Sequence, residues 1–395
     1  MALSFEENEA LTRVGPRTPG GEMLRRYWHP IAFAKELKGR PKHRRILGED
    51  LVLFRDDAGR LGLLASRCSH RGTSLEFGHI EDGGLRCCYH GWLYDVKGRV
   101  MEMPGEPAES TFKERVRQPA YQAQELAGIV FAYLGPEPAP LLPRYDVLVR
   151  DDGVRSMSAR VIHCNYLQMV ENSVDQHHFK WLHRTPKTRC WSEERLTSEI
   201  TDFGIRDTFT RRVGDEYFRT ISLFLMPNMN KVGYHLPEDH PAAFAATHEG
   251  YEALRWRVPV DDTAAMHFTV YFAPLYDGKP AAKLPQDKQE EGLADSTPGK
   301  YRWDEETGWI SRGDQDRCAQ ESQGPIFDRT GEHLGVSDEG VILLRRLYKQ
   351  CIDAVKHGQD PVGIIRDPAK NEIIRLVPGE YKLDQPELAN ERTRT

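Results

Sequence analysis

The residue types best suited to bind a metal gather in one segment, CSHRGTSLEFGHIEDGGLRCCYHGW. Cys68 and His70 lie near its start, and Cys87, Cys88 and His90 lie near its end. Two thiolates and two imidazoles on paired loops can hold a structural zinc ion. The same set can hold a [2Fe–2S] cluster with Cys on one iron and His on the other.

The order of the ligands favours the cluster. Each half carries one Cys and then one His, as Cys68-x-His70 and Cys87-x-x-His90, whereas zinc modules more often group like ligands as C-x-x-C. Neutral imidazoles in place of thiolates raise the reduction potential of a cluster, which suits delivery of electrons to oxygen chemistry. The spacing to His90 favours Cys87 over Cys88 as the ligand, and Cys88 is left without a role.

A second candidate centre lies in ENSVDQHHFKWLHR. Asp175 and His178 are three residues apart and share a helical face. His178 and His183 are five apart, about 140° of rotation on an ideal helix, so the helix must end, bend or bulge between them. Two His and one carboxylate form the facial triad of non-haem Fe(II) oxygenases, which leaves positions open for O₂ and substrate. Taken alone, these His are also compatible with ordinary polar positions around a helix.

The first segment resembles the Rieske motif of oxygenases, whose second loop usually reads C-P-Y-H-G-W, so Cys88 stands where Pro is usual. Followed by D-x-x-H-x-x-x-x-H, it is similar to the terminal oxygenase α subunit of Rieske non-haem iron oxygenases, in the phthalate-dioxygenase-like group. LTRVGPRTPGGEMLRRYWHP and QDRCAQESQGPIFDRTGEHLGVSDEGVILLRR also resemble that group. The resemblance is weakest over residues 185–310.

The resemblance implies two cofactors. A [2Fe–2S] Rieske cluster would be held by Cys68, His70, Cys87 and His90. A mononuclear Fe(II) would be held by His178, His183 and a carboxylate in QDRCAQES. The matching residue is Asp316; spacing alone does not separate it from Asp304, Asp314 or Asp328.

The resemblance also implies partners and further site residues. A reductase fed by NADH, sometimes with a ferredoxin, would supply electrons to a head-to-tail homotrimer. Asp175 would bridge neighbouring subunits by accepting hydrogen bonds from His178 of its own subunit and His90 of the next. Glu171 and Asn172 precede the triad by one helical turn and are candidate catalytic residues, although Glu171 is equally compatible with a helix-surface acid.

The expected reaction is the oxidation of a small aromatic compound, an aryl carboxylate, with O₂. Monooxygenation such as O-demethylation of a methoxyaryl acid is favoured. The alternative is ring hydroxylation, including cis-dihydroxylation, of a phthalate-type acid. A function of another class, a zinc-binding or electron-carrier module, is the competing interpretation.

The surrounding sequence predicts an α+β fold with three parts. Residues 1–44 are expected to form an N-terminal helical extension. Residues 45–150, with period-two apolar runs turning at DDAG and KG, are expected to form a small antiparallel β domain that carries the cluster. Residues 151–395 are expected to form the catalytic domain, a helix-grip in which a curved antiparallel sheet wraps a long C-terminal helix.

The clearest helix is SDEGVILLRRLYKQCIDAVKHG, with Asp338 as its cap and Gly358 just past its end. EYFRTISLFLMP and MHFTVYFAPLY are expected to be strands. The polar residues 276–313 are expected to form an exposed loop.

The composition excludes several function classes. The chain has 395 residues, 39% hydrophobic and 29% charged, with a net charge of -6, which argues against a nucleic-acid-binding protein. No apolar run reaches the about 18 residues of a membrane span, and the polar start does not resemble a signal peptide. A cytoplasmic location is therefore expected. Seven Cys, an odd number, do not indicate a disulfide framework.

Overall fold

Antiparallel hairpins build the β domain of the protein. The computed structural model describes residues 2–184, 186–233 and 251–383. A six-stranded sheet has the order β1-β10-β9-β4-β3-β2. Its strands are β1 Trp28–Phe33, β2 Lys42–Ile46, β3 Glu49–Arg55, β4 Leu61–Ala65, β9 Ala120–Leu126 and β10 Ile129–Tyr133. The hairpin predicted at DDAG is confirmed between β3 and β4.

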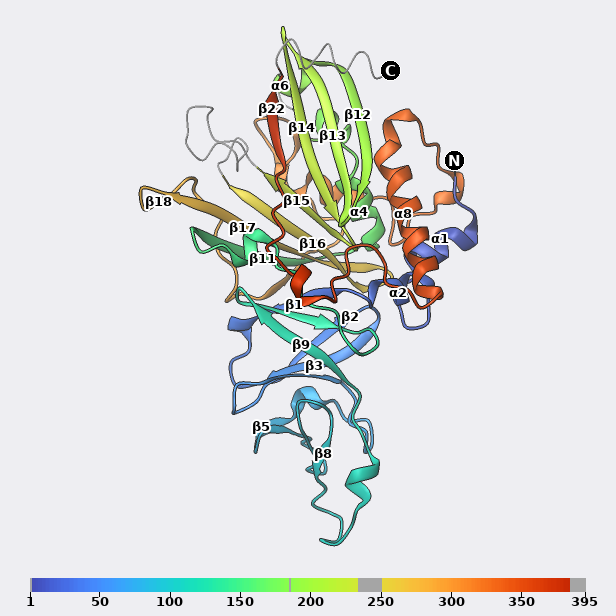
Figure 1. Cartoon of the computed structure of the whole chain (residues 1–395), viewed down its shortest axis with the longest axis vertical. Helices are drawn as coiled ribbons and strands as arrows, with labels where there is room; N and C mark the ends of the chain where they lie inside the picture. The colour runs from blue at the N-terminus through green and yellow to red at the C-terminus, as the bar shows by residue number, and fades with distance from the viewer. Residues whose placement is uncertain (1, 185, 234–250, 384–395) are drawn as a thin grey trace.

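A smaller four-stranded sheet forms the tip of this domain, at the lower end of Figure 1. Its strands are β5 His79–Glu81, β6 Gly84–Arg86, β7 Leu93–Tyr94 and β8 Val100–Glu102. The tip has its own apolar cluster, in which Phe54, Leu75 and Leu85 are fully buried. The hairpin predicted at KG is present between β7 and β8.

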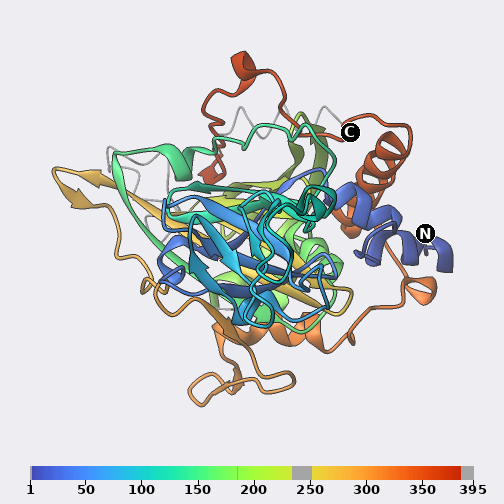
Figure 2. The same ribbon diagram turned by 90° about the horizontal axis from the view of Figure 1, so that it is seen from below.

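The predicted N-terminal helical extension is correct only up to Leu24. Helices α1 Phe5–Thr12 and α2 Pro19–Leu24 are followed by β1 and then β2, which crosses the expected boundary at residue 44. All six residues of β1 are buried, so this strand shows no alternation that would have revealed it. The two helices pack beside the C-terminal helix (Figure 2).

The larger part of the chain forms a ten-stranded sheet whose main path runs β12-β13-β14-β15-β16-β17-β11-β19, with β18 and β22 at its sides. Its strands are β11 Gly153–Ile162, β12 Trp191–Thr201, β13 Gly204–Val213, β14 Glu216–Leu225, β15 Met229–Gly233, β16 Glu252–Asp261, β17 Ala264–Tyr276, β18 Lys279–Pro280, β19 Leu293–Asp295 and β22 Gly379–Lys382. The predicted strands in EYFRTISLFLMP and MHFTVYFAPLY are confirmed. The expected loop 276–313 also contains short strands, including the hairpin of β20 Trp303–Asp304 and β21 Trp309–Ile310.

The helices of this part lie beside the sheet. They are α3 Asp146–Val149, α4 Tyr166–Ser173, α5 His178–Trp181, α6 Pro186–Arg189, α7 Arg312–Glu321 and α8 Glu339–Lys356. The predicted C-terminal helix is confirmed as α8, which packs on β12 and β13 (Figure 1). The fold is therefore α+β, with a long helix against a large antiparallel sheet. Asp338 precedes α8, but its carboxylate accepts from the Gly335 amide instead of capping α8.

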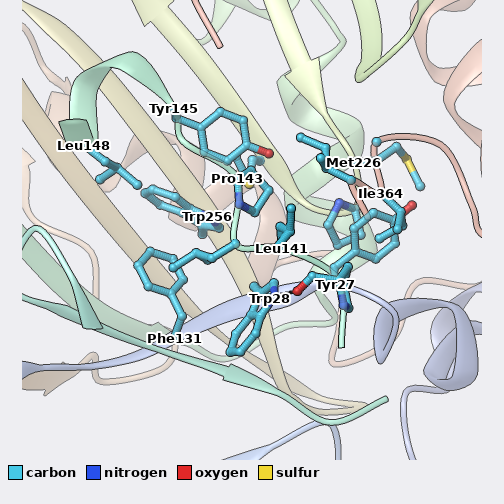
Figure 3. A pocket seen from close by; sticks show the side chains of 16 residues that line it. Tyr27, Trp28, Phe131, Leu141, Pro143, Tyr145, Leu148, Met226, Trp256 and Ile364 are labelled. Carbon is cyan, nitrogen blue, oxygen red and sulfur yellow. Dashed lines mark hydrogen bonds between the residues drawn. The ribbon is translucent and has the colours of Figure 1, made fainter. Parts of the chain in front are cut away.

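An apolar seam joins the two sheets. Figure 3 shows its lining, with Trp28 and Phe131 from the β domain, Trp256 from β16, and Leu141 and Tyr145 from the connecting segment. Among the described residues that line this cavity there is no carboxylate, thiol or imidazole, so the seam serves packing. Across the described ranges, none of the helices combines the length and the apolar character of a membrane span.

Candidate metal centres

Two loops at the tip of the β domain have the same pattern of backbone hydrogen bonds. In each loop the cysteine amide donates to the carbonyl five residues on, at 2.9 Å for both Cys68 and Cys87. The glycine four residues on, Gly72 or Gly91, donates back to the cysteine carbonyl at 2.8 and 3.1 Å. Both glycines have a positive φ, which a side chain would oppose. The loops therefore hold their cysteines in matched backbone positions, with His70 two residues after Cys68 and His90 three residues after Cys87.

The side chains of these loops converge. Cys68 and Cys87 are each 3% exposed, and the rings of His70 and His90 lie 4.5 Å apart. His70 Nδ1 is buried without a hydrogen-bond partner, as expected of an atom whose partner is a metal. Two buried sulfurs and two neighbouring imidazoles fit the donor set of a Rieske cluster.

The surroundings of these ligands are asymmetric. The Tyr94 hydroxyl lies 3.0 Å from Cys68 Sγ, and Trp92 stacks on His70. His90 and Cys88 are exposed at the outer end of the tip. His90 can therefore meet another molecule, whereas nothing in the structure explains Cys88.

The second group forms where a helix ends. As expected from the spacing, the helix ends between the two histidines, because α5 runs only from His178 to Trp181. The rings of His178 and His183 lie 5.1 Å apart.

Asp316 of α7 completes this group. Its Oδ1 lies 3.1 Å from His183 Nε2 and 3.7 Å from His178 Nε2, and the three candidate ligand atoms all lie within 4.8 Å of one another. His178 Nδ1 bonds to the Asp175 main-chain carbonyl, and His183 Nδ1 lies 2.6 Å from Gln315 Oε1. Protein contacts on both Nδ1 atoms leave the Nε2 lone pairs for a common ion. The residues present therefore fit a facial triad.

Electrostatics favour the ligating forms of Asp316 and His178, whereas burial of His183 is outweighed by the hydrogen bond and charge of Asp316, which raise the pKa of His183. Burial would raise the pKa of Asp316, but the hydrogen bond and charge of His183, with the charges of His178 and Arg255, hold it below its usual value. Burial lowers the pKa of His178. A carboxylate and a neutral imidazole are the forms that bind a divalent cation.

Asp175 lies beside the triad, but its carboxylate does not accept the hydrogen bond that was expected from His178. Its carboxylate accepts from the His177 amide at 2.9 Å and lies 3.9 Å from His178 Nδ1. The hydrogen bond of His178 goes instead to the Asp175 carbonyl, because the chain turns between the two helices. The carboxylate is 32% exposed, so one side of it remains open to a neighbour.

Glu171 is neither a pocket acid nor a surface acid. Its largely buried carboxylate lies 2.7 Å from both Arg329 and Arg345, and Arg345 also pairs with Glu332. Burial would raise the pKa of Glu171, but the two arginines outweigh it and lower the pKa. These contacts favour a structural role for Glu171, which ties α4 to the C-terminal segment, and its catalytic role stays a prediction. Asn172, in contrast, lines the cavity beside the triad.

The triad opens into a cavity that is partly open to solvent. Ile162, Met169, Phe179 and Val232 supply apolar wall, and polar groups from β11, β15, β16 and β17 face them. Gln315 was not identified from the sequence. The position of Gln315 next to Asp316 in the sequence does not show that the Gln315 side-chain amide reaches His183.

Comparisons with known proteins agree with this arrangement. A family model for the Rieske [2Fe-2S] domain matches residues 27–120. The chain is 36% identical over 395 residues to the 5,5'-dehydrodivanillate O-demethylase oxygenase subunit of Sphingobium sp. strain SYK-6, covering 95% of this chain and 86% of the relative. It is 35% identical over 404 residues to the phenoxybenzoate dioxygenase subunit alpha of Ectopseudomonas oleovorans, covering 94% and 90%.

Among solved structures, the fold is similar to the oxygenase in the carbazole-bound oxygenase and ferredoxin complex of carbazole 1,9a-dioxygenase. The TM-score is 0.60 at 22% identity, covering 87% of this chain and 92% of the other.

A Rieske domain within a chain that matches oxygenase subunits along almost its whole length defines an oxidoreductase of the Rieske oxygenase type. With relatives that match it along almost its whole length, this chain belongs to the oxygenase subunits of the Rieske non-haem iron oxygenases. Its cofactors are accordingly a [2Fe–2S] cluster and, in the catalytic domain, a mononuclear iron.

Proposed function

We propose that this oxygenase subunit O-demethylates a methoxylated aromatic acid, using O₂ and two electrons that come from NADH. The convergence of His178 Nε2, His183 Nε2 and Asp316 Oδ1 beside an open cavity is the observation that carries the proposal. Two imidazoles and one carboxylate leave coordination positions of an iron free for O₂ and substrate.

In this proposal the residues divide the work. Cys68, His70, Cys87 and His90 hold the cluster that receives electrons. His178, His183 and Asp316 hold the iron, which supplies O₂ activation when bound. Asn172 lines the same cavity and would orient the substrate.

Electrons would pass between subunits of a head-to-tail homotrimer. The tip loops lie at the far end of the molecule from α4 (Figure 1), and exposed His90 and half-open Asp175 could meet across an interface. Asp175 would accept a hydrogen bond from His90 of the next subunit. A reductase, with or without a ferredoxin, would feed the cluster; the similar carbazole oxygenase is known in complex with a ferredoxin.

The reaction balances as a monooxygenation. One oxygen atom enters the methoxy C–H bond and the other leaves as water, taking up two electrons and two protons. The resulting hemiacetal loses formaldehyde and leaves a phenol. The relative named as an O-demethylase favours this outcome, whereas the relative named as a dioxygenase supports ring hydroxylation, including cis-dihydroxylation, as the second candidate.

The test is turnover of the purified, metal-loaded protein with a surrogate reductase, NADH and a panel of methoxylated aryl acids. Formaldehyde and phenol formed in equal amounts support demethylation. Dihydrodiol or ring-hydroxylated products without formaldehyde support the second candidate. NADH-dependent reduction of the cluster without any substrate-dependent O₂ uptake would contradict both and favour an electron-carrier role.

A further inference from the structure

A row of basic side chains crosses the cavity wall that faces the triad. Strands β11, β17 and β16 are neighbours (Figure 1), and their register places Arg160 opposite His267 and His267 opposite Arg257. All three side chains line the triad cavity. We call Arg160, His267 and Arg257 the basic row. Because side chains alternate along a strand, Trp256 points to the opposite side, into the apolar seam of Figure 3.

Among the described residues, the two guanidinium groups of the basic row have hydrogen-bond acceptors but no ion-pair partner. Arg257 is 6% exposed; its guanidinium donates to Asn230 Oδ1, but it forms no ion pair within the described ranges. The nearest acceptor of Arg160 is the Gly313 carbonyl at 3.5 Å. His267 Nε2 is buried without a hydrogen-bond partner.

A third arginine of the cavity provides the contrast. Arg317 lies 3.3 Å from both Asp314 and Glu321, as is usual for a buried guanidinium. Burial lowers the pKa of Arg257 to about 9, so it is still charged at neutral pH. Burial also lowers the pKa of His267 well below its usual value, so its imidazole is neutral. The cavity thus holds buried positive charge that the protein leaves uncompensated.

The cavity offers little negative charge in return. Among the described residues that line it, Asp316 is the one carboxylate, and its charge is directed to the two histidines. A bound iron would add further positive charge. An anionic ligand would neutralise this positive charge. A carboxylate can form two parallel hydrogen bonds with a guanidinium.

We propose that the basic row is the subsite for the substrate's carboxylate. Arg257 forms an ion pair with the carboxylate, His267 forms a hydrogen bond with it, and Arg160 supplies a second positive charge. The aromatic ring lies over the apolar wall near Phe179, which directs its methoxy end to the triad. This inference rests on the proposed function for the identity of the ring, and it adds the residues that select an acid over a neutral analogue of the same shape.

Ligand binding without turnover tests the subsite. Under anaerobic conditions, the metal-loaded protein is titrated calorimetrically with 4-methoxybenzoate and with the isosteric 4-methoxybenzamide. The wild type is expected to prefer the acid. Arg257→Gln should weaken binding of the acid by about 10- to 100-fold, the range for hydrogen bonds to charged groups, and leave binding of the amide nearly unchanged. Arg257→Lys should retain part of the preference.

Arg206→Gln is the matched control, because it removes one arginine charge from an exposed site on β13 that pairs with Glu199. It should leave both affinities unchanged. Arg160→Gln and His267→Asn provide independent variants if Arg257→Gln fails to fold, which circular dichroism and the content of mononuclear iron report. Equal affinity of the wild type for acid and amide would overturn the proposal. Unchanged affinity of folded Arg257→Gln for the acid would also overturn it. If that variant does not fold, unchanged acid affinity in Arg160→Gln and His267→Asn would overturn it instead.

The two proposals fail separately. If acids are demethylated while Arg257→Gln binds them normally, the subsite is wrong and the proposed reaction stands. If acids bind through Arg257 but yield no formaldehyde, the subsite stands and demethylation is wrong.

Discussion

The two candidate metal centres differ in how the chain assembles them. The cluster ligands come from two loops of matched conformation, close together in sequence, at the tip of a small β domain. The triad joins the end of one helix to another helix, and the contact between His183 and Gln315 spans 132 residues. The first centre depends on local loop geometry, whereas the second depends on the packing of the whole catalytic domain.

Their exposure differs as well. His90 reaches the surface at the tip, where an electron donor or a neighbouring subunit can approach. The triad histidines are only 11–12% exposed and open into an internal cavity. An electron inlet needs contact with other proteins, and oxygen chemistry needs an enclosed site.

The largest effects are expected from exchanging ligands at each centre. Cys87→Ser should abolish the Rieske spectrum while the triad still binds iron. His178→Ala should keep the spectrum but lose the mononuclear iron. Both should lower turnover by more than about 100-fold. Metal analysis and reduced-state EPR check this, and loss of both metals from either variant would show that the centres are not independent.

Asp175→Asn tests the link between the regions. The variant keeps an oxygen for the His177 amide but loses the negative charge that the proposal places against His90 of the neighbouring subunit. We expect both metals to be retained and turnover to be largely abolished. Stopped-flow reoxidation of the reduced cluster should slow in parallel. Near-normal turnover would remove Asp175 from the electron path.

Glu171→Gln should affect stability more than catalysis. Removing one charge leaves Arg329 and Arg345 buried beside a neutral amide, which costs about 3–5 kcal/mol for a buried pair. Denaturant unfolding measures this cost. The control is Glu9→Gln, which loses a partly exposed pair with Arg13 and is expected to cost less than about 1 kcal/mol. Activity lost without destabilisation would return Glu171 to a catalytic role.

The smallest expected effect is a change of the unfolding free energy with pH, caused by a residue near the connection between α4 and α5. Asp207 is fully buried, accepts from Ser198 Oγ at 2.6 Å, and has a pKa raised to about 7, mainly by burial and also by Glu339 and Asp175. The folded protein therefore keeps a proton that the unfolded chain releases above about pH 4. This contribution to stability is present at low pH and is lost as pH rises through 7.

Asp207→Asn should remove this loss. Between pH 5 and pH 8, the unfolding free energy of the wild type should fall by more than that of the variant, with a difference on the order of a few kcal/mol or less. Parallel pH profiles would show that Asp207 does not hold a proton in the folded state.

The difference between the two centres also explains which features could be predicted from the sequence. The cluster ligands, the hairpins and α8 follow from local patterns of spacing, turn residues and helical periodicity. Strand β1 could not be predicted because all of its residues are buried. The ion pairs of Glu171 could not be predicted because its partners, Arg329 and Arg345, are distant in the sequence. The basic row depends on strand register, which alternation in one strand does not determine.

Mixed oligomers test the central claim, that electrons cross from the cluster of one subunit to the triad of the next. Cys87→Ser subunits keep only the triad and His178→Ala subunits keep only the cluster. Each alone should be inactive, and co-assembled in equal amounts they should recover roughly a quarter of wild-type turnover, the share of head-to-tail contacts that pair an intact cluster with an intact triad. No recovery in stable mixed oligomers would place electron transfer within one chain and contradict the account.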